Sequence, residues 1–419
     1  MRRLATALRA LSPRGRALLA AILVVVLAGA GFLGYLVWGG SPFGSGPRVE
    51  ALTTSSGATV SDGDLVPAGT ALRLTFNAEM DESSLRLLAN GTPLGLSWAQ
   101  DRRSAALDVA SLHRGRVALS VAPGARDTAG HSLARWELAF SLIFGLPTHT
   151  VPLSAPVLVQ VPNDPSARDQ AGLQAAAFVY EYVTEGGVTR FTAIYTSAPD
   201  SVGPVRSGRL ISFSLTRHYR GLLLASGLSE GSAAVLRSNP VPHVFDTGGG
   251  VFQRRGDRSS PNNLFTGGTA MQRAVAGASL PHVVLPLGTV PIHSGAGATS
   301  VSVPQHRSVY SFATSTGTYT KQVEGRTLAD AGTGQPLHIQ LLVVLHTTAT
   351  QTSFVEDVNG AHGLDFDMQS GGRAEFYFDG IQANGRWTTP SPNAPLRFQL
   401  DSGTTVSPPP LTWVDVVTS

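Results

Sequence analysis

The chain has 419 residues, 42% hydrophobic and 14% charged, which suffices for two or three globular units with sizeable cores. Its 46 glycines and 27 prolines indicate many turns and a β-rich protein, while the absence of cysteine excludes disulfides, thiolate metal sites, a cysteine nucleophile and a lipid-modified N-terminal cysteine. The net charge is +3, and the basic residues outside the N-terminus form no stripe, so we expect no nucleic-acid partner. Lys321 is the only lysine, which we attribute to a general preference for arginine.

Residues 1–38 are predicted to be a basic cytoplasmic segment followed by a transmembrane anchor. Ala17–Trp38 carries no charge and follows five arginines, and a helix of this length crosses a bilayer core of about 30 Å. The positive-inside rule then places the N-terminus in the cytoplasm and the rest of the chain outside, beginning with a linker at 39–47. A signal peptide cleaved near Ala28-Gly29-Ala30 is the alternative, and it also exports the remaining chain.

Residues 48–143 are predicted to form an antiparallel β-sandwich. Short apolar alternations at 72–77, 104–109, 116–123 and 136–142 are separated by turn residues, among them Asn90-Gly91. The strings LRLTFNAEMDESSLRLLANG and GARDTAGHSL resemble bacterial Ig-like domains, which implies a spacer or adhesion module without catalysis. Three aspartates of this region could be imagined as calcium ligands, but turn capping explains them more simply: Asp62, Asp81 and Asp127.

The segment 176–197 is predicted to be a β-hairpin around Gly186-Gly187. With a two-residue turn, Glu181, Glu185 and Arg190 share one face of the hairpin. The other face would carry an aromatic layer of Phe178, Tyr180, Tyr182, Phe191 and Tyr195. An arginine between two glutamates is either a structural ion cluster or a binding site.

A helix is predicted from about Ser207 to Gly221, directly after the turn Gly203-Pro204. Arg206 and Arg209 would lie at its N-terminus, where the helix dipole disfavours cations. This placement favours an anion site for a carboxylate or phosphate, or else pairing of the arginines with the hairpin glutamates.

Residues 246–265 form a polar loop whose composition is typical of functional loops. A solvated turn is the alternative interpretation. Its candidate residues are Arg254, Asp257, Arg258, Asn262 and Asn263.

The central and C-terminal parts of the chain resemble the YerB-like family of bacterial envelope proteins, a domain of unknown function often found on lipoproteins. The strings EGGVTRF and GPVRSGR carry the resemblance, which covers roughly residues 150–417. It implies an extracytoplasmic location and a shared ligand-binding surface. The residues assigned to that surface are Asn163, Arg168, Glu181, Glu185, Arg190, Arg206, Arg209, Arg254, Arg258 and Asn263.

The chain also departs from the family pattern. A histidine usual after the strand 222–226 is missing, and another is replaced by Asn262. If the family used those histidines as acid, base or metal ligands, this member lacks that chemistry. The cysteine that would carry a lipid is absent, and the predicted anchor takes its place.

The C-terminal half is predicted to be β-rich. Strands are expected in SVSVPQ, HIQLLVVLH, AEFYFDGIQANGRW, PLRFQLDSGTTV and LTWVDVV. Trp387, Phe398 and Trp413 are interpreted as core residues, with glycan stacking by an exposed tryptophan as the alternative. No metal site is predicted from His346, His362 and Asp365.

The predicted fold is therefore multidomain. It comprises the transmembrane helix, the Ig-like sandwich at 48–143, an α+β domain at 150–297 and a β-rich YerB-like domain at 298–419. We expect no cofactor, because no nucleophile elbow, phosphate loop, dinucleotide fingerprint or zinc spacing is present.

Three functions remain open. The first is a membrane-anchored extracytoplasmic protein that binds or scaffolds peptidoglycan or other envelope components. The second is a wall hydrolase with Glu181 and Glu185 as acid and base, although Arg190 between them would lower the pKa of both. The third is a purely structural anchor.

Overall fold

The computed structural model describes residues 46–418, except 56, 63, 68–69, 113–114, 144–149, 248, 284, 286 and 289. The chain divides into two compact units, the first built mainly from residues before Ala139 and the second mainly from those after it. The predicted anchor at 17–38 lies outside the described residues. Among those described, no helix combines the length and apolar character needed to cross a membrane.

Residues 46–143 form two β-sheets. The four-stranded sheet has the order β1-β3-β7-β6, with β1 Val49–Thr54, β3 Leu72–Phe76, β6 Leu96–Trp98 and β7 Ser104–Leu107. The five-stranded sheet has the order β2-β9-β8-β4-β5, with β2 Leu65–Pro67, β4 Leu87–Ala89, β5 Thr92–Leu94, β8 Gly115–Val121 and β9 Glu137–Ile143. A 3₁₀ turn, η1, spans Val109–Ser111. In β3 the apolar residues are buried and Arg73 between them is exposed, as expected for a strand with one face on a core.

The turn residues of this region behave as their types predict. Asn90 and Gly91 have positive φ angles of 49° and 80° and join β4 to β5, the geometry that this dipeptide favours in a tight hairpin. Asp81 and Asp127 accept backbone N–H groups within their own turns, which is capping. These features agree with a β-sandwich, and the resemblance to Ig-like domains stays a prediction.

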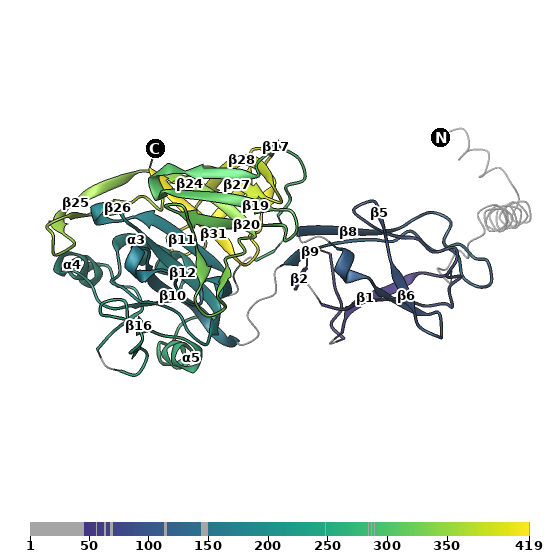
Figure 1. Ribbon diagram of the computed structural model, residues 1–419, viewed down its shortest axis with the longest axis horizontal. Helices are drawn as coiled ribbons and strands as arrows, with labels where there is room; N and C mark the ends of the chain where they lie inside the picture. Colours follow the sequence, from purple (N-terminus) through teal and green to yellow (C-terminus); the bar gives the residue numbers. More distant parts are fainter. Residues whose placement is uncertain are drawn as a thin grey trace, which may run out of the picture. The chain divides into compact units, whose positions relative to one another are not determined.

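The second unit is dominated by one twelve-stranded sheet, with the order β14-β13-β10-β12-β11-β31-β24-β27-β28-β29-β30 and β17 paired to β28 (Figure 1). Its strands are β10 Thr150–Pro162, β11 Phe178–Val183, β12 Thr189–Pro199, β13 Leu222–Ala225, β14 His243–Phe245, β17 Ala296–Gly297, β24 Leu341–Thr347, β27 Gly372–Phe378, β28 Ile381–Thr388, β29 Arg397–Leu400, β30 Thr405–Val406 and β31 Thr412–Thr418.

Smaller elements complete this unit. A four-stranded sheet contains β18 Ser300–Val303, β19 Ser308–Ala313, β20 Thr318–Val323 and β21 Arg326–Thr327. Three strand pairs are β15 Gln253–Arg254 with β16 Leu264–Phe265, β22 Ala329–Asp330 with β23 Gln335–Pro336, and β25 Ala349–Val355 with β26 His362–Phe366. The helices are α3 Leu210–Tyr219, α4 Glu230–Ser238 and α5 Gly268–Gly277, with 3₁₀ turns η2 Pro165–Ala167, η3 Leu173–Ala175, η4 Glu185–Gly187 and η5 Pro304–His306.

The two predicted domains at 150–297 and 298–419 contribute strands to the same sheet. β31, from the end of the chain, runs parallel to β11 on one side and to β24 on the other. The predicted strands of the C-terminal half are present, and Trp387, Phe398 and Trp413 are buried, as expected of core residues. The two halves of the unit therefore depend on each other for sheet pairing.

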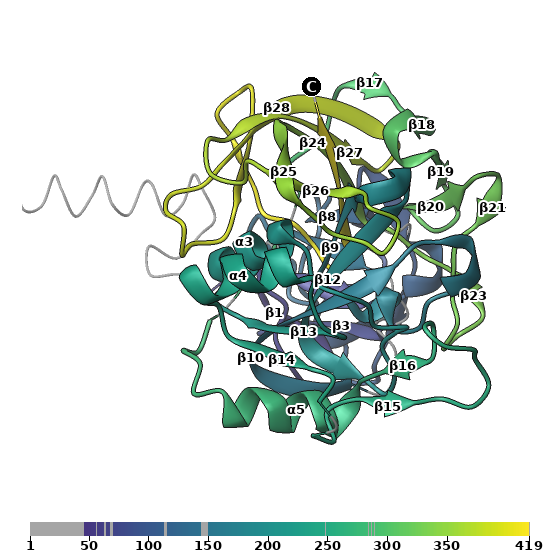
Figure 2. The same ribbon diagram turned by 90° about the vertical axis from the view of Figure 1, so that its left-hand side faces the viewer.

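Both faces of the sheet are covered, as the two views of the ribbon show (Figures 1 and 2). On one face, Met271 and Val275 of α5 and Tyr310 and Tyr319 of β19 and β20 join the sheet in one apolar core. On the other face, the core includes five residues of α3 and one of α4: Leu210, Ile211, Phe213, Leu215, Tyr219 and Leu236.

The predicted hairpin register is wrong by one residue. β11 and β12 are joined by the 3₁₀ turn η4, so Tyr182, and not Val183, pairs with Arg190. A slip of one residue moves every side chain of a strand to the opposite face. Glu181 therefore does not share a face with Arg190. The predicted aromatic layer is likewise split: Phe178, Tyr180 and Tyr182 face one core, whereas Phe191 and Tyr195 face the other.

Truncation after Pro410 should abolish folding of the second unit, because it removes β31 from between β11 and β24. The lost strand carries three fully buried side chains, Trp413, Val414 and Val416, each worth about 1.5–3 kcal/mol by burial. Their sum approaches the whole stability of a typical domain, about 5–15 kcal/mol. Thermal unfolding followed by circular dichroism should show loss of the main transition. A truncation after Val417, which keeps the buried part of β31, should retain it, and an equal loss in both would contradict the prediction.

Candidate functional site

The carboxyl ends of β10, β11 and β13 lie at one edge of the main sheet. These strands run in the same direction, since β10 is parallel to β13 and antiparallel to β12, which is antiparallel to β11. The Arg206 N–H donates to the Gln160 carbonyl oxygen at 2.9 Å, and the Ser226 N–H donates to the Arg206 carbonyl oxygen at 3.0 Å, which fixes the predicted GPVRSGR segment at this edge. Open α/β sheets bind ligands at such an edge.

Glu181, on β11, is fully buried and surrounded by donors. Its Oε2 lies 2.7 Å from Lys321 Nζ and accepts the Trp413 Nε1–H at 3.0 Å. Its Oε1 accepts hydrogen bonds from Thr189 Oγ1 at 2.8 Å and Asn163 Nδ2 at 3.3 Å. The carboxylate is thus held on all sides inside the protein.

A second buried carboxylate lies beside it, because Asp415 is the direct neighbour of Glu181 in the pairing of β11 with β31. Like charges opposite each other in a sheet are destabilising unless cations compensate. Lys321 and His306 supply that compensation, with His306 Nδ1 2.8 Å from Asp415 Oδ1. We call Glu181, His306, Tyr310, Lys321 and Asp415 the lysine cluster.

The ammonium of Lys321 is fixed by further contacts. It donates to Ser308 Oγ at 2.7 Å and to the Tyr310 hydroxyl at 2.5 Å. It also lies 4.4 Å from the centroid of the Tyr310 ring and 5.1 Å from that of Trp413, where cation–π attraction operates. The only lysine of the chain is therefore completely enclosed.

The electrostatics of the lysine cluster shift the pKa values of three of its members, His306, Asp415 and Tyr310. Burial by itself lowers the pKa of His306, but the charge of Asp415, its hydrogen bond and the charge of Glu181 outweigh burial and raise that pKa above 6.5. Burial by itself raises the pKa of Asp415, but Lys321 and His306 outweigh it and lower that pKa below 3.8. Burial raises the pKa of Tyr310 well above 10, so this hydroxyl stays neutral.

Ligand atoms of Glu181, His306 and Asp415 lie within 4.8 Å of one another, close enough to hold a metal ion. Both ring nitrogens of His306 are nevertheless engaged, since Nε2 lies 3.1 Å from the Val416 carbonyl oxygen while Nδ1 contacts Asp415. A metal ligand needs a free imidazole nitrogen. The geometry in the described structure is therefore that of an internal ion network.

Glu185 and two of the predicted arginines form a separate group on the opposite face of the sheet. Arg209 binds the Glu185 carboxylate through two nitrogens: Nε lies 2.9 Å from Oε2, and Nη2 pairs with Oε1. Arg190 Nη2 lies 3.9 Å from Glu185 Oε1, and its Nη1 donates to the Ser207 carbonyl oxygen at 2.9 Å. We call Glu185, Arg190, Arg206, Arg209 and Glu356 the arginine cluster.

Glu356 completes this cluster from the turn between β25 and β26. Its Oε1 lies 3.5 Å from Arg209 Nη1, and its Oε2 accepts a hydrogen bond at 3.0 Å from the hydroxyl of Ser229, the N-cap of α4. The hydroxyl of Ser232 binds the same carboxylate at 2.9 Å. A carboxylate at a helix N-terminus is favoured by the helix dipole.

Arg206 differs from the other arginines of the cluster. It is partly exposed, and its only recorded side-chain hydrogen bond among the described residues is to Asn262 Oδ1 at 3.0 Å. No carboxylate of the described residues pairs with it. Burial, followed by the nearby charge of Arg190, lowers the pKa of Arg206 below 12.5. The charge of Asp164 opposes this shift but makes no ion pair with Arg206, so the guanidinium has no carboxylate in direct contact.

Asn163 and Arg168 have structural contacts. Arg168 donates from Nε and Nη2 to the Asn163 carbonyl oxygen, at 3.2 and 2.8 Å, and its Nη1 pairs with Glu324 at 3.0 Å. A small pocket of about 90 Å³ lies beside these residues and next to Thr189 and His306. The lysine cluster therefore lies just beneath this pocket.

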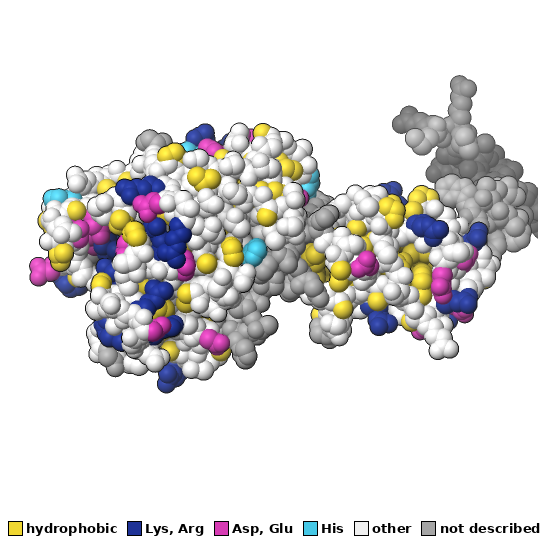
Figure 3. All heavy atoms as spheres, in the orientation of Figure 1, with side chains coloured by type: hydrophobic (Ala, Val, Ile, Leu, Met, Phe, Trp, Pro, Cys, Tyr) yellow, Lys and Arg dark blue, Asp and Glu magenta, His cyan; other side chains and the backbone are white. Residues whose placement is uncertain are grey.

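The predicted loop residues do not converge on the arginine cluster as a set. Arg254 pairs with Asp246 at 2.5 Å and donates to Asn263 Oδ1 at 3.1 Å, and its side chain is 55% exposed. Arg258 donates to two backbone carbonyl oxygens, of Ala167 and Asp169. Among these loop residues, Asn262 is hydrogen-bonded to Arg206, whose Nη1 donates to the Asn262 Oδ1. On the face drawn in Figure 3, basic side chains likewise lie beside acidic ones.

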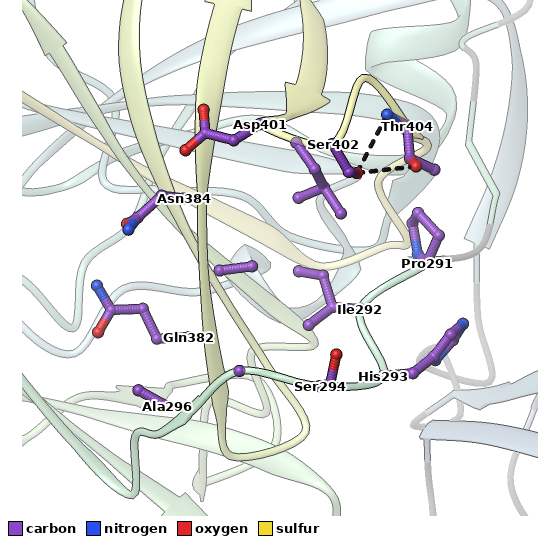
Figure 4. Close-up of a pocket in the computed structure, with 13 residues that line it drawn as sticks. Pro291, Ile292, His293, Ser294, Ala296, Gln382, Asn384, Asp401, Ser402 and Thr404 are labelled. Carbon is purple, nitrogen blue, oxygen red and sulfur yellow. Dashed lines mark hydrogen bonds between the residues drawn. The ribbon is translucent and has the colours of Figure 1, made fainter.

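A larger pocket of about 570 Å³ lies elsewhere in the second unit, between residues 291–296 and the strands β28 and β29 (Figure 4). Its polar side chains include Gln382, Asn384 and Asp401, and Ser402 bonds to Thr404 across the β29–β30 turn. None of the ten residues predicted from the sequence lines it. Its lining residues include no phenylalanine, tyrosine or tryptophan, the side chains on which sugars usually stack.

Sequence reasoning missed five residues of the two clusters: His306, Tyr310, Lys321, Glu356 and Asp415. One signal was available for Lys321, since a chain with 31 basic residues that retains one lysine has a reason for it at that position. Asp415 within the apolar run LTWVDVV was a second signal, because a charge in a buried strand needs a partner.

Comparison with known proteins gives the relatives of this chain. Models of the N-terminal and C-terminal domains of DUF3048, described as a protein of unknown function, match residues 145–281 and 299–414. The Bacillus subtilis (strain 168) protein named "Putative lipoprotein YerB" is 27% identical over 290 residues, covering 62% of this chain and 81% of the relative. The crystal structure of YerB protein from Bacillus subtilis matches with a TM-score of 0.50 and 24% identity, covering 66% of this chain and 94% of that chain. This second match supports the fold alone.

Replacing Lys321 by methionine should lower the free energy of unfolding by about 3–5 kcal/mol, because two buried carboxylates would keep only one cation. Chemical denaturation of the two proteins measures this difference. The exposed Arg326, which pairs with Asp169, provides a control, and Arg326→Met should change stability by less than about 1 kcal/mol. The double variant Glu181→Gln/Lys321→Met should recover part of the loss. A neutral effect of Lys321→Met would refute the charge compensation.

The stability of the second unit should fall as the pH rises above about 6.5. The pKa of His306 is raised in the folded protein, so protonated His306 stabilises the fold fully below its unfolded pKa. That contribution is lost as the pH rises through its folded pKa. Asp415, whose pKa is lowered, stabilises above about pH 3.8 and loses its contribution only in acid. Melting temperatures between pH 6 and 9 should show the fall in the native chain and not in His306→Gln. The control variant His243→Gln, at an exposed histidine, should keep the fall in melting temperature with pH. If His306→Gln shows the same fall as the native chain, His306 is not its cause.

Proposed function

The chain belongs to the DUF3048 family, and from this premise we propose that it is an envelope protein that binds an anionic group at Arg206. The family is described as having no known function, so the proposal is built on the site itself. The observation that carries it is the guanidinium of Arg206, which has no carboxylate in direct contact and lies near the charge of Arg190.

The location in the envelope rests on two supports. The YerB relative is named as a lipoprotein, which is a membrane-attached class of exported protein. In this chain the uncharged segment 17–38 follows five arginines, the order expected for a single-pass anchor with its N-terminus in the cytoplasm. Without cysteine, attachment through a lipid on that residue is not available, so we propose the segment as the anchor, with the bulk of the chain extracytoplasmic.

The charge balance of the arginine cluster supports anion binding. Three guanidinium groups, of Arg190, Arg206 and Arg209, accompany two carboxylates, of Glu185 and Glu356. Both carboxylates contact Arg209, and Glu185 also lies near Arg190, so Arg206 is the guanidinium without a carboxylate in contact. The charge of Asp164 acts on Arg206 without forming an ion pair with it. An arriving anion would meet a donor that has already lost part of its hydration.

A carboxylate or phosphate is the ligand class that fits a guanidinium, which presents paired N–H groups to two oxygens. Asn262 lies beside Arg206 and is held by Ser166 Oγ at 2.8 Å, so its orientation is set before a ligand arrives. Envelope polymers such as peptidoglycan carry such groups on an extended surface. We therefore propose a wall polymer or another envelope component as the partner.

The arrangement lends no support to a hydrolase that uses Glu181 and Glu185 as acid and base. The two carboxylates bind partners on opposite faces of the sheet, Lys321 for Glu181 and Arg209 for Glu185. Both side chains are almost fully buried and already in contact with these cations, so neither faces an open site where it could act on a substrate. The pairing of Glu185, Arg209 and Glu356 instead suits a structural role, which would hold the surface around Arg206 in place.

The proposal is tested with the full chain and purified cell wall in a sedimentation assay. Arg206→Gln should weaken binding about tenfold or more, since a hydrogen bond to a charged group is worth about 1.5–3 kcal/mol. Binding should also weaken as salt is raised, because the partly exposed charge is screened.

The control is Arg254→Gln, which removes an exposed arginine already paired with Asp246 and should leave binding unchanged. Melting temperatures of both variants are measured alongside. If Arg206→Gln binds as the native chain does, Arg206 is not the site. If it loses stability while retaining affinity, the cluster is structural and the proposed function fails.

A further inference from the structure

The contact between Lys321 and Glu181 brings a nucleophile against a carboxyl group. Lys321 Nζ lies 2.7 Å from Glu181 Oε2, and both side chains have an exposed fraction of 0%. Groups held this close are near the geometry from which bonds form, in which the reacting atoms lie about 3–3.5 Å apart. The contact joins two distant segments of the chain, β20 and β11, and it involves neither Arg206 nor the anion site proposed there.

The surroundings of this contact exclude water. The rings of Tyr310 and Trp413 are fully buried, and Nζ lies 4.4 and 5.1 Å from their centroids. Water stabilises the ionised forms of an amine and a carboxylic acid, and it hydrolyses reactive acyl intermediates. Without water, a proton can pass from the ammonium to the carboxylate and leave an uncharged amine beside an uncharged acid. These are the forms that condense to an amide.

The donors around Glu181 suit an attack of the amine on its carboxyl carbon, Cδ. Oε1 accepts hydrogen bonds from Thr189 Oγ1 at 2.8 Å and Asn163 Nδ2 at 3.3 Å. This oxygen gains negative charge during the attack, and donors aimed at it stabilise that charge. Oε2 is the oxygen in contact with Lys321, and it accepts the Trp413 Nε1–H at 3.0 Å. Both oxygens of the reaction intermediate would therefore have donors in place.

Tyr310 and Asp415 provide a path for the protons. The Tyr310 hydroxyl accepts a hydrogen bond from Lys321 Nζ at 2.5 Å. Burial, followed by the charge of Asp415, raises the pKa of Tyr310 well above 10, so a carboxylate lies near this hydroxyl. Asp415 Oδ1 contacts His306, whereas its Oδ2 is buried without a hydrogen-bond partner in the described structure. This unsatisfied oxygen is available to accept a proton.

We propose that Lys321 and Glu181 condense to an intramolecular isopeptide bond in the folded protein, and that their ion pair is the state before condensation. The bond between Nζ and Cδ forms, the bond between Cδ and Oε2 breaks, and the oxygen leaves as water. One proton passes from Nζ through Tyr310 to Asp415, which returns it to the leaving hydroxyl. The step needs no oxidant, reductant or other co-reactant. Asp415 and His306 then remain as a balanced pair.

Such a bond would tie the main sheet to the four-stranded sheet covalently, because Glu181 belongs to β11 and Lys321 to β20. The chain has no cysteine and therefore no disulfide for this purpose. A cross-link between residues far apart in sequence stabilises a protein mainly by restricting its unfolded chain.

The proposal is tested by mass spectrometry of the full chain after folding, under denaturing conditions. The native chain should be one water molecule lighter than its sequence requires, whereas Lys321→Arg, which keeps the charge but has no amine to condense, should show no such loss. Trypsin cuts after free lysine and arginine. The linked chain should yield one branched peptide of residues 169–190 and 308–326, while an unlinked chain is cut after Lys321 into 308–321 and 322–326.

Two variants test the proton path while keeping both reacting groups. Asp415→Asn and Tyr310→Phe should each slow the appearance of the branched peptide after refolding by about a hundredfold or more, the size of a general acid–base contribution. Circular dichroism shows whether each variant has refolded. The matched control is Asp401→Asn, at an exposed carboxylate outside the lysine cluster, which should form the bond at the native rate.

Three results would overturn the proposal. The first is a native chain of full sequence mass that trypsin cuts after Lys321. The second is a branched peptide that joins 308–326 to 398–419, since Asp415 would then be the acceptor in place of Glu181. The third is formation at the native rate in folded Asp415→Asn and Tyr310→Phe. Arg206→Gln leaves the lysine cluster intact and should form the bond normally, so the isopeptide bond and the anion site can fail independently.

Discussion

Two carboxylates on neighbouring strands of a buried sheet repel each other, and the second unit is organised around the neutralisation of that pair. Glu181 and Asp415 are adjacent in the pairing of β11 with β31. The cations that balance them are Lys321, from β20 of the four-stranded sheet, and His306, from the 3₁₀ turn η5. The N-terminal half supplies one carboxylate, and the C-terminal half supplies the other three groups. Assembly of the main sheet and docking of the small sheet are therefore coupled by charge as well as by apolar packing.

The two clusters lie on different faces of the same sheet. Side chains alternate along a strand, so Glu181 points to the lysine cluster while the turn after β11 carries Glu185 to the arginine cluster. The first cluster is sealed and balanced, with two cations for two anions. The second is nearer to solvent and has one more cation than carboxylate. Substitutions at Arg206 therefore leave the core that supports this surface undisturbed.

Much of the fold could be predicted from the sequence, because apolar alternation and turn dipeptides report local structure directly. The strands around PVLVQVP and LTWVDVV, the helix after GPVRSGR and the buried Trp413 are examples. The site was predicted less well. Gly186-Gly187 permits either a two-residue turn or a 3₁₀ turn, and the choice decides which face Glu181 occupies. The partners of Glu181 are distant in sequence, so only the parallel pairing of β11 with β31 reveals them.

The burial of Lys321 has a consequence for the chemistry of the molecular surface. Since it is the only lysine in the chain, the folded protein presents no side-chain primary amine to its surroundings. Every other basic side chain is a guanidinium or an imidazole, neither of which forms amide bonds with activated carboxyl groups under ordinary conditions. Enzymes and reagents that join proteins to wall polymers through lysine would find no acceptor side chain on this protein. Any covalent attachment of this protein to a wall polymer would have to use a group other than a lysine side chain.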